Sequence, residues 1–130
     1  MKLNTILGKG KITLSFEVFP PKSDANFESV RRAAYNVAAL RPSYMSVTYG
    51  AGGSTSKNTL AIAEGIQKEY DVPAIAHLTC VGATKASIQQ ALTDMRAAGV
   101  ENVLALRGDR PAWMEGEPFT DYHYASELVE

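Results

Sequence analysis

The feature of this sequence that most constrains its fold is a regular alternation of short β-rich runs with stretches of helical periodicity. In the helical stretches, apolar side chains recur at spacings of three and four residues, which is typical of one buried helix face. The expected strands occupy residues 12–19, 44–49, 74–80 and 102–106. The expected helices occupy residues 26–40 and 57–70, a third stretch from an N-cap at Thr84 to about Gly99, and a fourth that starts in 122–130. This alternation predicts βαβ units and a parallel sheet.

Two architectures contain such units, the doubly wound sheet and the (β/α)8 barrel. A dinucleotide-binding doubly wound fold carries a Gly-rich turn after its first strand, but here Pro20-Pro21 follows that strand and no GxGxxG or GxxxxGK[ST] motif occurs. Polar residues instead lie at or near the ends of all four expected strands: Glu17, Thr48, His77 and Asp109. Because these positions surround the active-site mouth of a barrel, the pattern favours the (β/α)8 fold.

The length of the chain corresponds to only half of such a barrel. A complete barrel needs about 250 residues, whereas these 130 residues hold four βα units. We therefore interpret residues 1–130 as a single partial domain, the N-terminal half of a TIM barrel that is truncated in or after its fourth helix. A half barrel leaves two sheet edges and one sheet face uncovered. We expect a homo-oligomer, or association with the missing half barrel.

Composition excludes several classes of function. Thirteen basic and 14 acidic residues give a formal net charge of −1, so there is no electrostatic reason to expect nucleic acid or an anionic membrane as a partner. No apolar run approaches the roughly 18 residues that a membrane span requires, and no secretory signal is recognisable. One cysteine and two histidines do not support a metal cluster. These features predict a soluble, cytoplasmic protein without a metal site.

Five short motifs resemble those of the methylenetetrahydrofolate reductase family and occur in the same order. They are SFEVFPPK from Ser15, SVTYG from Ser46, HLTC from His77, LRGDRP from Leu106 and YASELV from Tyr124. Any one of them alone would be weak evidence, but together they cover nearly the whole chain. The resemblance implies an oxidoreductase with FAD as cofactor, which uses NAD(P)H to reduce 5,10-methylenetetrahydrofolate to 5-methyltetrahydrofolate in one-carbon and methionine metabolism.

The resemblance also implies roles for individual residues. Glu17 would be the general acid that protonates a folate nitrogen, and Asp109 would lie near both the flavin ring and the pterin. Glu17 lies in an otherwise apolar run, so we expect it to be buried, with a raised pKa. The alternatives are a structural ion pair for Glu17, for example with Arg107, and a loop-capping role for Asp109. Substrate contacts are expected from Glu17, Thr48 and Asp109, and cofactor contacts from Thr48, Tyr49, His77, Arg107, Gly108, Asp109, Tyr124 and Ala125.

Some of these cofactor residues also have a physical reason for the role or a simpler explanation. The guanidinium group of Arg107 offers forked donors to phosphate or carbonyl oxygens, and Gly108 permits close backbone approach. Packing alone would account for Thr48 and Tyr49, and His77 could be an ordinary core residue. For the chain as a whole, the alternatives are a catalytically inactive half-barrel fragment that folds by pairing, and a different barrel enzyme with a phosphate-bearing substrate.

Overall fold

The computed structural model describes residues 1–8, 10–21, 24–49, 56–110, 112–116 and 121–129, apart from the side chain of Trp113. It contains four strands, β1 (Ser15–Val18), β2 (Tyr44–Val47), β3 (Ala74–Thr79) and β4 (Asn102–Leu106). Three helices alternate with them, α1 (Phe27–Ala38), α2 (Ser56–Tyr70) and α3 (Lys85–Ala97). Single 3-10 turns are η1 (Leu3–Thr5), η2 (Asp24–Asn26), η4 (Ala112–Met114) and η5 (Ala125–Leu128).

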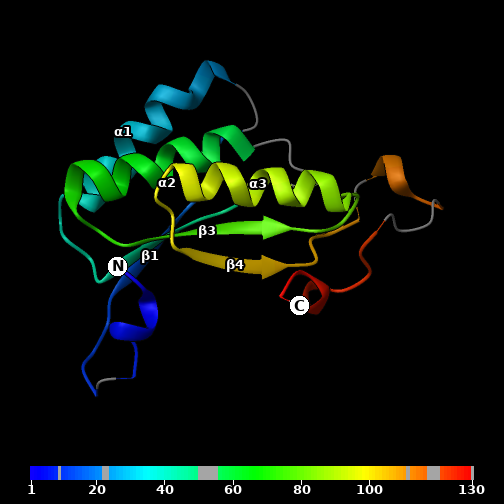
Figure 1. Ribbon diagram of the computed structural model, residues 1–130. Coiled ribbons are helices and arrows are strands. Elements are labelled where there is room, and N and C mark those ends of the chain that lie inside the picture. The colour runs from blue at the N-terminus through cyan, green and yellow to red at the C-terminus, as the bar shows by residue number, and fades with distance from the viewer. Residues whose placement is uncertain (9, 22–23, 50–55, 111, 117–120, 130) are drawn as a thin grey trace.

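The four strands form one parallel sheet in the order β1-β2-β3-β4. All three α-helices lie on the same side of this sheet (Figure 1). Sequential parallel strands with each crossover helix on one face are the arrangement of a closed barrel, since a doubly wound sheet has helices on both faces. The structure therefore confirms the α/β fold and is consistent with half of a TIM barrel.

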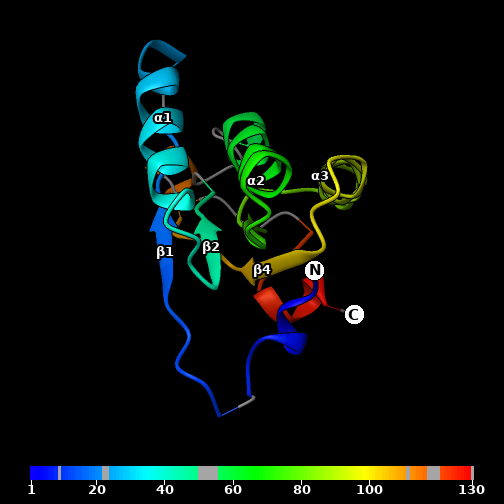
Figure 2. The ribbon, with the colours of Figure 1, turned by 90° about the vertical axis from the view of Figure 1, so that its left-hand side faces the viewer.

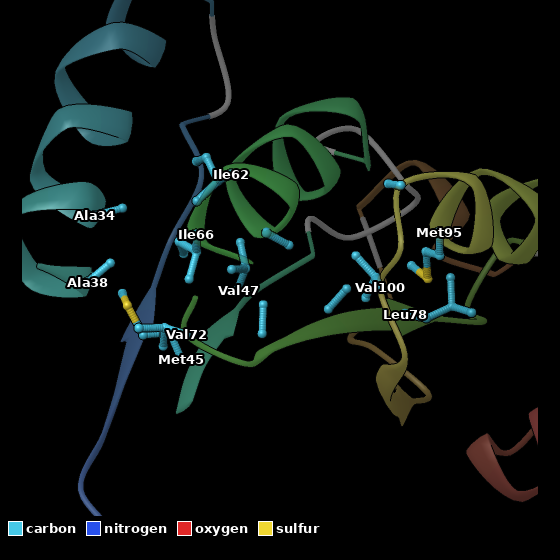
Figure 3. Packing of buried hydrophobic residues seen from close by; sticks show 14 of the residues in the cluster. Ala34, Ala38, Met45, Val47, Ile62, Ile66, Val72, Leu78, Met95 and Val100 are labelled. Carbon is cyan, nitrogen blue, oxygen red and sulfur yellow. The ribbon is translucent and has the colours of Figure 1, made fainter. Parts of the chain in front are cut away.

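The hydrophobic core lies between the sheet and the helices (Figure 3). Alternate residues of β2 and β3 point into it, among them Met45, Val47 and Leu78, and they meet Ile62 and Ile66 of α2. Each of these five side chains is at most 2% exposed. Burial of one such side chain contributes roughly 1.5–3 kcal/mol to the free energy of unfolding, so this layer stabilises the packing of the helices on the sheet.

Helices α1 and α2 approach each other closely because Gly65 has no side chain. A Cβ atom at Gly65 would overlap with the hydroxyl group of Tyr35 on α1. The Tyr35 ring in turn packs against Tyr70 at the end of α2, with ring centroids 5.3 Å apart. The glycine costs helix propensity, but it lets α1 lie against α2 and complete the cover over β1 and β2.

The opposite face of the sheet has no α-helix over it in the part of the chain that the structure describes (Figure 2). On this face Leu104, which pairs with His77 in the ladder, is 43% exposed. Phe16 pairs with the core residue Met45 and so faces the helix side, but it lies at the outer edge of β1 and is 37% exposed. Leu14, directly before β1, is 60% exposed. The expectation of an uncovered face and uncovered edges is met by these side chains.

Most expected elements are present, with shorter ends. The first strand begins at Ser15 instead of residue 12, because the ladder with β2 starts at the pair Ser15 and Tyr44. The N-cap at Thr84 is confirmed, since its side chain accepts a hydrogen bond from the Ser87 N–H in a capping box.

The expectation of a helix starting in 122–130 is wrong in type. The described residues there form only the 3-10 turn η5, within which Leu128 packs against the core. The Glu127 carboxylate accepts hydrogen bonds from the N–H groups of His123 and Tyr124 at distances of 2.6 and 2.9 Å. These bonds cap the turn at its start, but within the described residues the turn is not continued into an α-helix.

None of the helices in the described ranges has the length and hydropathy needed to cross a bilayer.

Candidate active site at the carboxyl end of the sheet

A hydrogen-bonded group of three side chains crosses the uncovered face of the sheet, one from each of the first three strands. The Ser46 hydroxyl donates to Oε2 of Glu17 at 2.9 Å, and its Oγ lies 2.6 Å from Nε2 of His77. The same Glu17 oxygen is 3.5 Å from His77 Nε2. The parallel register pairs Glu17 directly with Ser46, so the group is built by neighbouring strands. We call these three residues the Glu17–Ser46–His77 chain.

His77 is the buried member of this chain, with 6% of its surface exposed. Burial lowers the pKa of its imidazole below the usual 6.5, and the negative charge of Glu17 opposes that shift. The ring is therefore neutral near pH 7. A neutral imidazole has one N–H donor and one acceptor nitrogen, so it can pass a hydrogen bond along a chain of side chains.

The expectation that Glu17 is buried is wrong. Its side chain is 45% exposed, because Glu17 points to the sheet face that no helix covers. The alternative of an ion pair with Arg107 is not found among the described residues, where the ionisable neighbour of Glu17 is His77. The site therefore presents a carboxyl group that is anchored on one oxygen and open to solvent on the uncovered side.

Thr48 and Tyr49 directly follow β2, the strand that contains Ser46. The Thr48 N–H donates to the Val18 carbonyl, and its own carbonyl accepts from the Thr59 hydroxyl on α2. Tyr49 is half-buried, and burial raises the pKa of its hydroxyl while a hydrogen bond with Ser56 opposes the rise. Thr48 is thus held through its backbone and Tyr49 through its side chain, both at the carboxyl end of the sheet.

Arg107, Gly108 and Asp109 form the loop that leaves β4. Arg107 and Asp109 are exposed, and the Arg107 Nε–H donates to the Gly108 carbonyl at 3.3 Å. Within the described residues no hydrogen bond or ion pair joins Arg107 or Asp109 to the Glu17–Ser46–His77 chain. The structure therefore brings Glu17 and His77 together and leaves the β4 loop as a separate part of the site.

Gly108 is required by two features of this loop. Its φ is +82°, a conformation that side chains disfavour. A Cβ atom there would also lie 2.8 Å from Cγ1 of Val81 and 3.1 Å from Cβ of Thr79. The groups that Gly108 approaches closely in this structure are Val81 and Thr79, at and just after the end of β3.

Thr79 and Tyr49 line an open pocket of about 450 Å³ together with the first turns of α3. The Thr79 Oγ1 atom is buried and has no hydrogen-bond partner among the described residues. A buried hydroxyl without a partner is uncommon.

Tyr124 and Ala125 open the turn η5, next to β4 in space. Tyr124 is 66% exposed. Three residues of the recognised motifs, Lys22, Gly50 and Pro111, lie outside the described residues. In those same ranges, no group of three potential metal ligands is found.

Two residues of the site were not identified as site residues from the sequence. Ser46 joins Glu17 to His77, and the signal for it is alternation along β2, which places Ser46 on the same face as Thr48. Thr79 lies two residues beyond His77 and so shares its face of β3. Serine and threonine are common in strands, so neither residue can be identified as a site residue until the register of the strands is known.

The fold and these contacts define an α/β half barrel with a polar, ionisable site at the carboxyl end of its parallel sheet. The family model for methylenetetrahydrofolate reductase matches residues 2–130. A maize protein named methylenetetrahydrofolate reductase (NADH) 1 is 40% identical over 110 residues, which cover 85% of this chain and 18% of the relative. An Escherichia coli protein named 5,10-methylenetetrahydrofolate reductase is 35% identical over 121 residues, which cover 93% of this chain and 40% of the relative.

The chain therefore belongs to the methylenetetrahydrofolate reductase family. It spans less than half the length of these relatives, and a fission yeast relative named methylenetetrahydrofolate reductase 1 is matched over 20% of its length.

Proposed function

We propose that this chain contributes to the reduction of 5,10-methylenetetrahydrofolate to 5-methyltetrahydrofolate, with NAD(P)H as the hydride source and FAD as the cofactor, in one-carbon and methionine metabolism. The observation that supports this most is the Glu17–Ser46–His77 chain. It combines an open carboxyl group with a neutral imidazole at the positions where three of the family motifs converge. Family membership supplies the reaction class.

In this proposal Glu17 is the general acid. Opening the one-carbon bridge of the substrate requires a proton on the departing folate nitrogen, and the exposed side of the Glu17 carboxyl group can deliver it. A general acid in position contributes on the order of 10²–10⁴-fold to the rate. Asp109, exposed on the β4 loop, and Thr48 would contact the folate beside it.

The residues at the other strand ends fit a flavin dinucleotide by their donor chemistry. Arg107 is exposed, and within the described residues its guanidinium group makes one hydrogen bond, from Nε–H to the Gly108 carbonyl. The two terminal NH2 groups can therefore donate to phosphate or carbonyl oxygens of the cofactor. His77, Tyr49 and Tyr124 offer further polar contacts, and Ala125 and the backbone of Gly108 would complete the contacts with the cofactor. Bound FAD would supply hydride transfer from the nicotinamide to the one-carbon unit.

Titration with FAD tests this proposal directly. The purified 130-residue chain should bind FAD and hold its absorbance through gel filtration, and Arg107→Ala should weaken that binding. Glu28→Gln, which removes an exposed carboxylate of α1 that pairs with Arg31, should leave the affinity unchanged. A chain that takes up no FAD would favour the alternative, a catalytically inactive half barrel.

We also propose that the open sheet is covered by further βα units, either in a second copy of this chain or in the missing half of the barrel. The exposed side chain of Leu104 on the open face supports this, as do those of Phe16 and Leu14 at the outer edge of β1, because exposed apolar groups of this size are costly in water. The unpaired outer edges of β1 and β4 support it as well, since exposed parallel edges invite further strands.

A further inference from the structure

The Glu17–Ser46–His77 chain has a direction that follows from the number of protons it contains. A serine hydroxyl has a single proton, and the Ser46 proton lies in the bond to Oε2 of Glu17. The 2.6 Å contact between Ser46 Oγ and His77 Nε2 must then use a proton on the imidazole. His77 is therefore in the Nε2–H tautomer, donates to Ser46, and Ser46 donates to Glu17.

This direction distinguishes the two oxygens of Glu17. Oε2 accepts from Ser46 and lies 3.5 Å from His77 Nε2, so donors already surround it. Oε1 makes no hydrogen bond or ion pair within the described residues. A proton on the carboxyl group is most compatible with Oε1, because a proton on Oε2 would compete with the Ser46 hydroxyl for the same oxygen.

We propose that Ser46 is a positioning residue for Glu17: held by the N–H group of His77, its hydroxyl occupies Oε2 and leaves Oε1 as the oxygen that carries and delivers the proton. This inference rests on the proposed role of Glu17 as general acid. The anchor works in both protonation states, because Oε2 of a carboxylic acid still accepts a hydrogen bond when the proton is on Oε1. Ser46 thus orients the acid without taking part in the transfer.

The position of His77 in the sheet supports a fixed tautomer. His77 is 6% exposed and pairs across the ladder with Leu104 of β4, which offers no polar side chain on that side. Glu17 from β1 is the charged group that acts on the ring, and Ser46 from β2 is its hydrogen-bond partner. No other side chain within the described ranges bonds to Nε2, so the tautomer depends on Ser46.

Nitrogen-15 NMR of the two histidines tests the hydrogen bonds from His77 to Ser46 and from Ser46 to Glu17, and it needs neither FAD nor substrate. At a pH of about 8, above the usual histidine pKa of about 6.5, the wild-type chain should show His77 in the Nε2–H tautomer, with the exposed His123 as internal reference. Ser46→Ala should shift His77 toward a mixture of tautomers, and Ser46→Thr, which keeps the hydroxyl, should retain the wild-type pattern. Ser15→Ala, on the same face of β1 as Glu17, should change nothing.

Rapid kinetics with FAD bound tests the role of the anchor. Ser46→Ala should slow the folate half-reaction by roughly 10–100-fold, the usual consequence of a misplaced catalytic group, while NAD(P)H still reduces the flavin at the wild-type rate. Ser46→Thr should restore the folate step. Equal slowing of both half-reactions, or no slowing of either, would overturn the positioning role.

The tautomer measurement and the kinetic measurement distinguish a failure of the Ser46 inference from a failure of the proposed function. An Nδ1–H tautomer of His77 in the wild-type chain would overturn the Ser46 inference even if Ser46→Ala fails to fold, and it would leave the proposed reaction standing. A wild-type chain with the Nε2–H tautomer but without FAD-dependent folate reduction would instead overturn the proposed function, and with it the catalytic role of Ser46.

Discussion

Gly108 shows how one residue in this fold meets two demands at once, a left-handed backbone and a crowded neighbour. Its φ of +82° resembles the +75° of Gly99, but a Cβ at Gly99 would meet no atom within 4 Å. The two glycines therefore separate backbone strain from steric overlap. Gly108 belongs to the β4 loop that carries Arg107 and Asp109, so its conformation controls where those side chains can lie.

Replacing Gly108 by alanine should cost more stability than the same change at Gly99. We expect Gly99→Ala to lower the free energy of unfolding by about 1 kcal/mol, the backbone contribution alone. Gly108→Ala should cost roughly 2–4 kcal/mol, because overlap with Val81 is added. Urea unfolding of both variants measures the difference. Equal losses in the free energy of unfolding would mean that Val81 and Thr79 can move away from the new Cβ atom without an energetic cost.

His77 should make the stability of the chain depend on pH. Its pKa is lowered by burial in the folded state, so the unfolded chain binds a proton more readily and stability falls as the pH drops below about 6.5. His77→Gln should remove this component, which is at most about 1.4 kcal/mol per pH unit. His123→Gln, at the exposed histidine, should keep it. Unfolding measured between pH 5 and 8 compares the slopes, and identical slopes in all three proteins would contradict the burial effect.

At the scale of residues, the sequence identified Glu17 and His77 correctly as neighbours at the site but not the residue between them. The motifs mark which positions matter, whereas the contact through Ser46 depends on the register of β1 with β2. Burial of Glu17 was predicted from its apolar neighbours, Phe16 and Val18. That prediction is wrong because strand neighbours point to opposite faces, and the face of Glu17 is uncovered.

The elements were predictable where local chemistry determines them. Helix α3 is the clearest case, since Thr84 is a recognisable N-cap residue in the sequence. The structure adds that Ser87 completes a reciprocal capping box with it. The Lys85 N–H is bonded at 2.7 Å to the Asp121 carboxylate, a partner 36 residues away that no local pattern reveals. Where the sequence pattern indicates the start of a fourth helix, the described residues form the 3-10 turn η5, which contacts β4 and the core.

Removing the cap of α3 should destabilise the chain by about 1 kcal/mol. Thr84→Ala leaves the Ser87 N–H without its acceptor, and such losses usually lie between about 0.5 and 2 kcal/mol. Thr93→Ala is the matched control, because Thr93 lies within α3, where its hydroxyl donates only to the Gln89 carbonyl of the preceding turn. Thermal unfolding followed by circular dichroism compares the two. A control that loses as much as Thr84→Ala would show that capping is not the cause.

For the molecule as a whole, the strand count and the one-sided helix layer were predictable, and the means of covering the open face was not. Hydrophobic periodicity identifies which residues face the helices. It does not identify what covers Leu104 on the other side, or Phe16 at the outer edge of β1.

Association of the chain should therefore depend on concentration. Sedimentation should show a species larger than the 14.0 kDa monomer. Leu104→Ser with Phe16→Ser should shift it toward monomer, because these changes remove apolar area from the open face and from the outer edge of β1. Leu40→Ser, at an exposed leucine beyond the end of α1, should not. A monomer at all concentrations would contradict self-association.

The most direct test of the account compares the two half-reactions in Glu17→Gln with those of the wild-type chain, each in the assembly in which it binds FAD. Glutamine keeps the shape of Glu17 but cannot donate the proton. The account predicts that the folate half-reaction slows by about 10²–10⁴-fold while flavin reduction by NAD(P)H proceeds at the wild-type rate. Equal loss of both half-reactions, or an unchanged folate half-reaction, would contradict the assignment of Glu17 as the general acid.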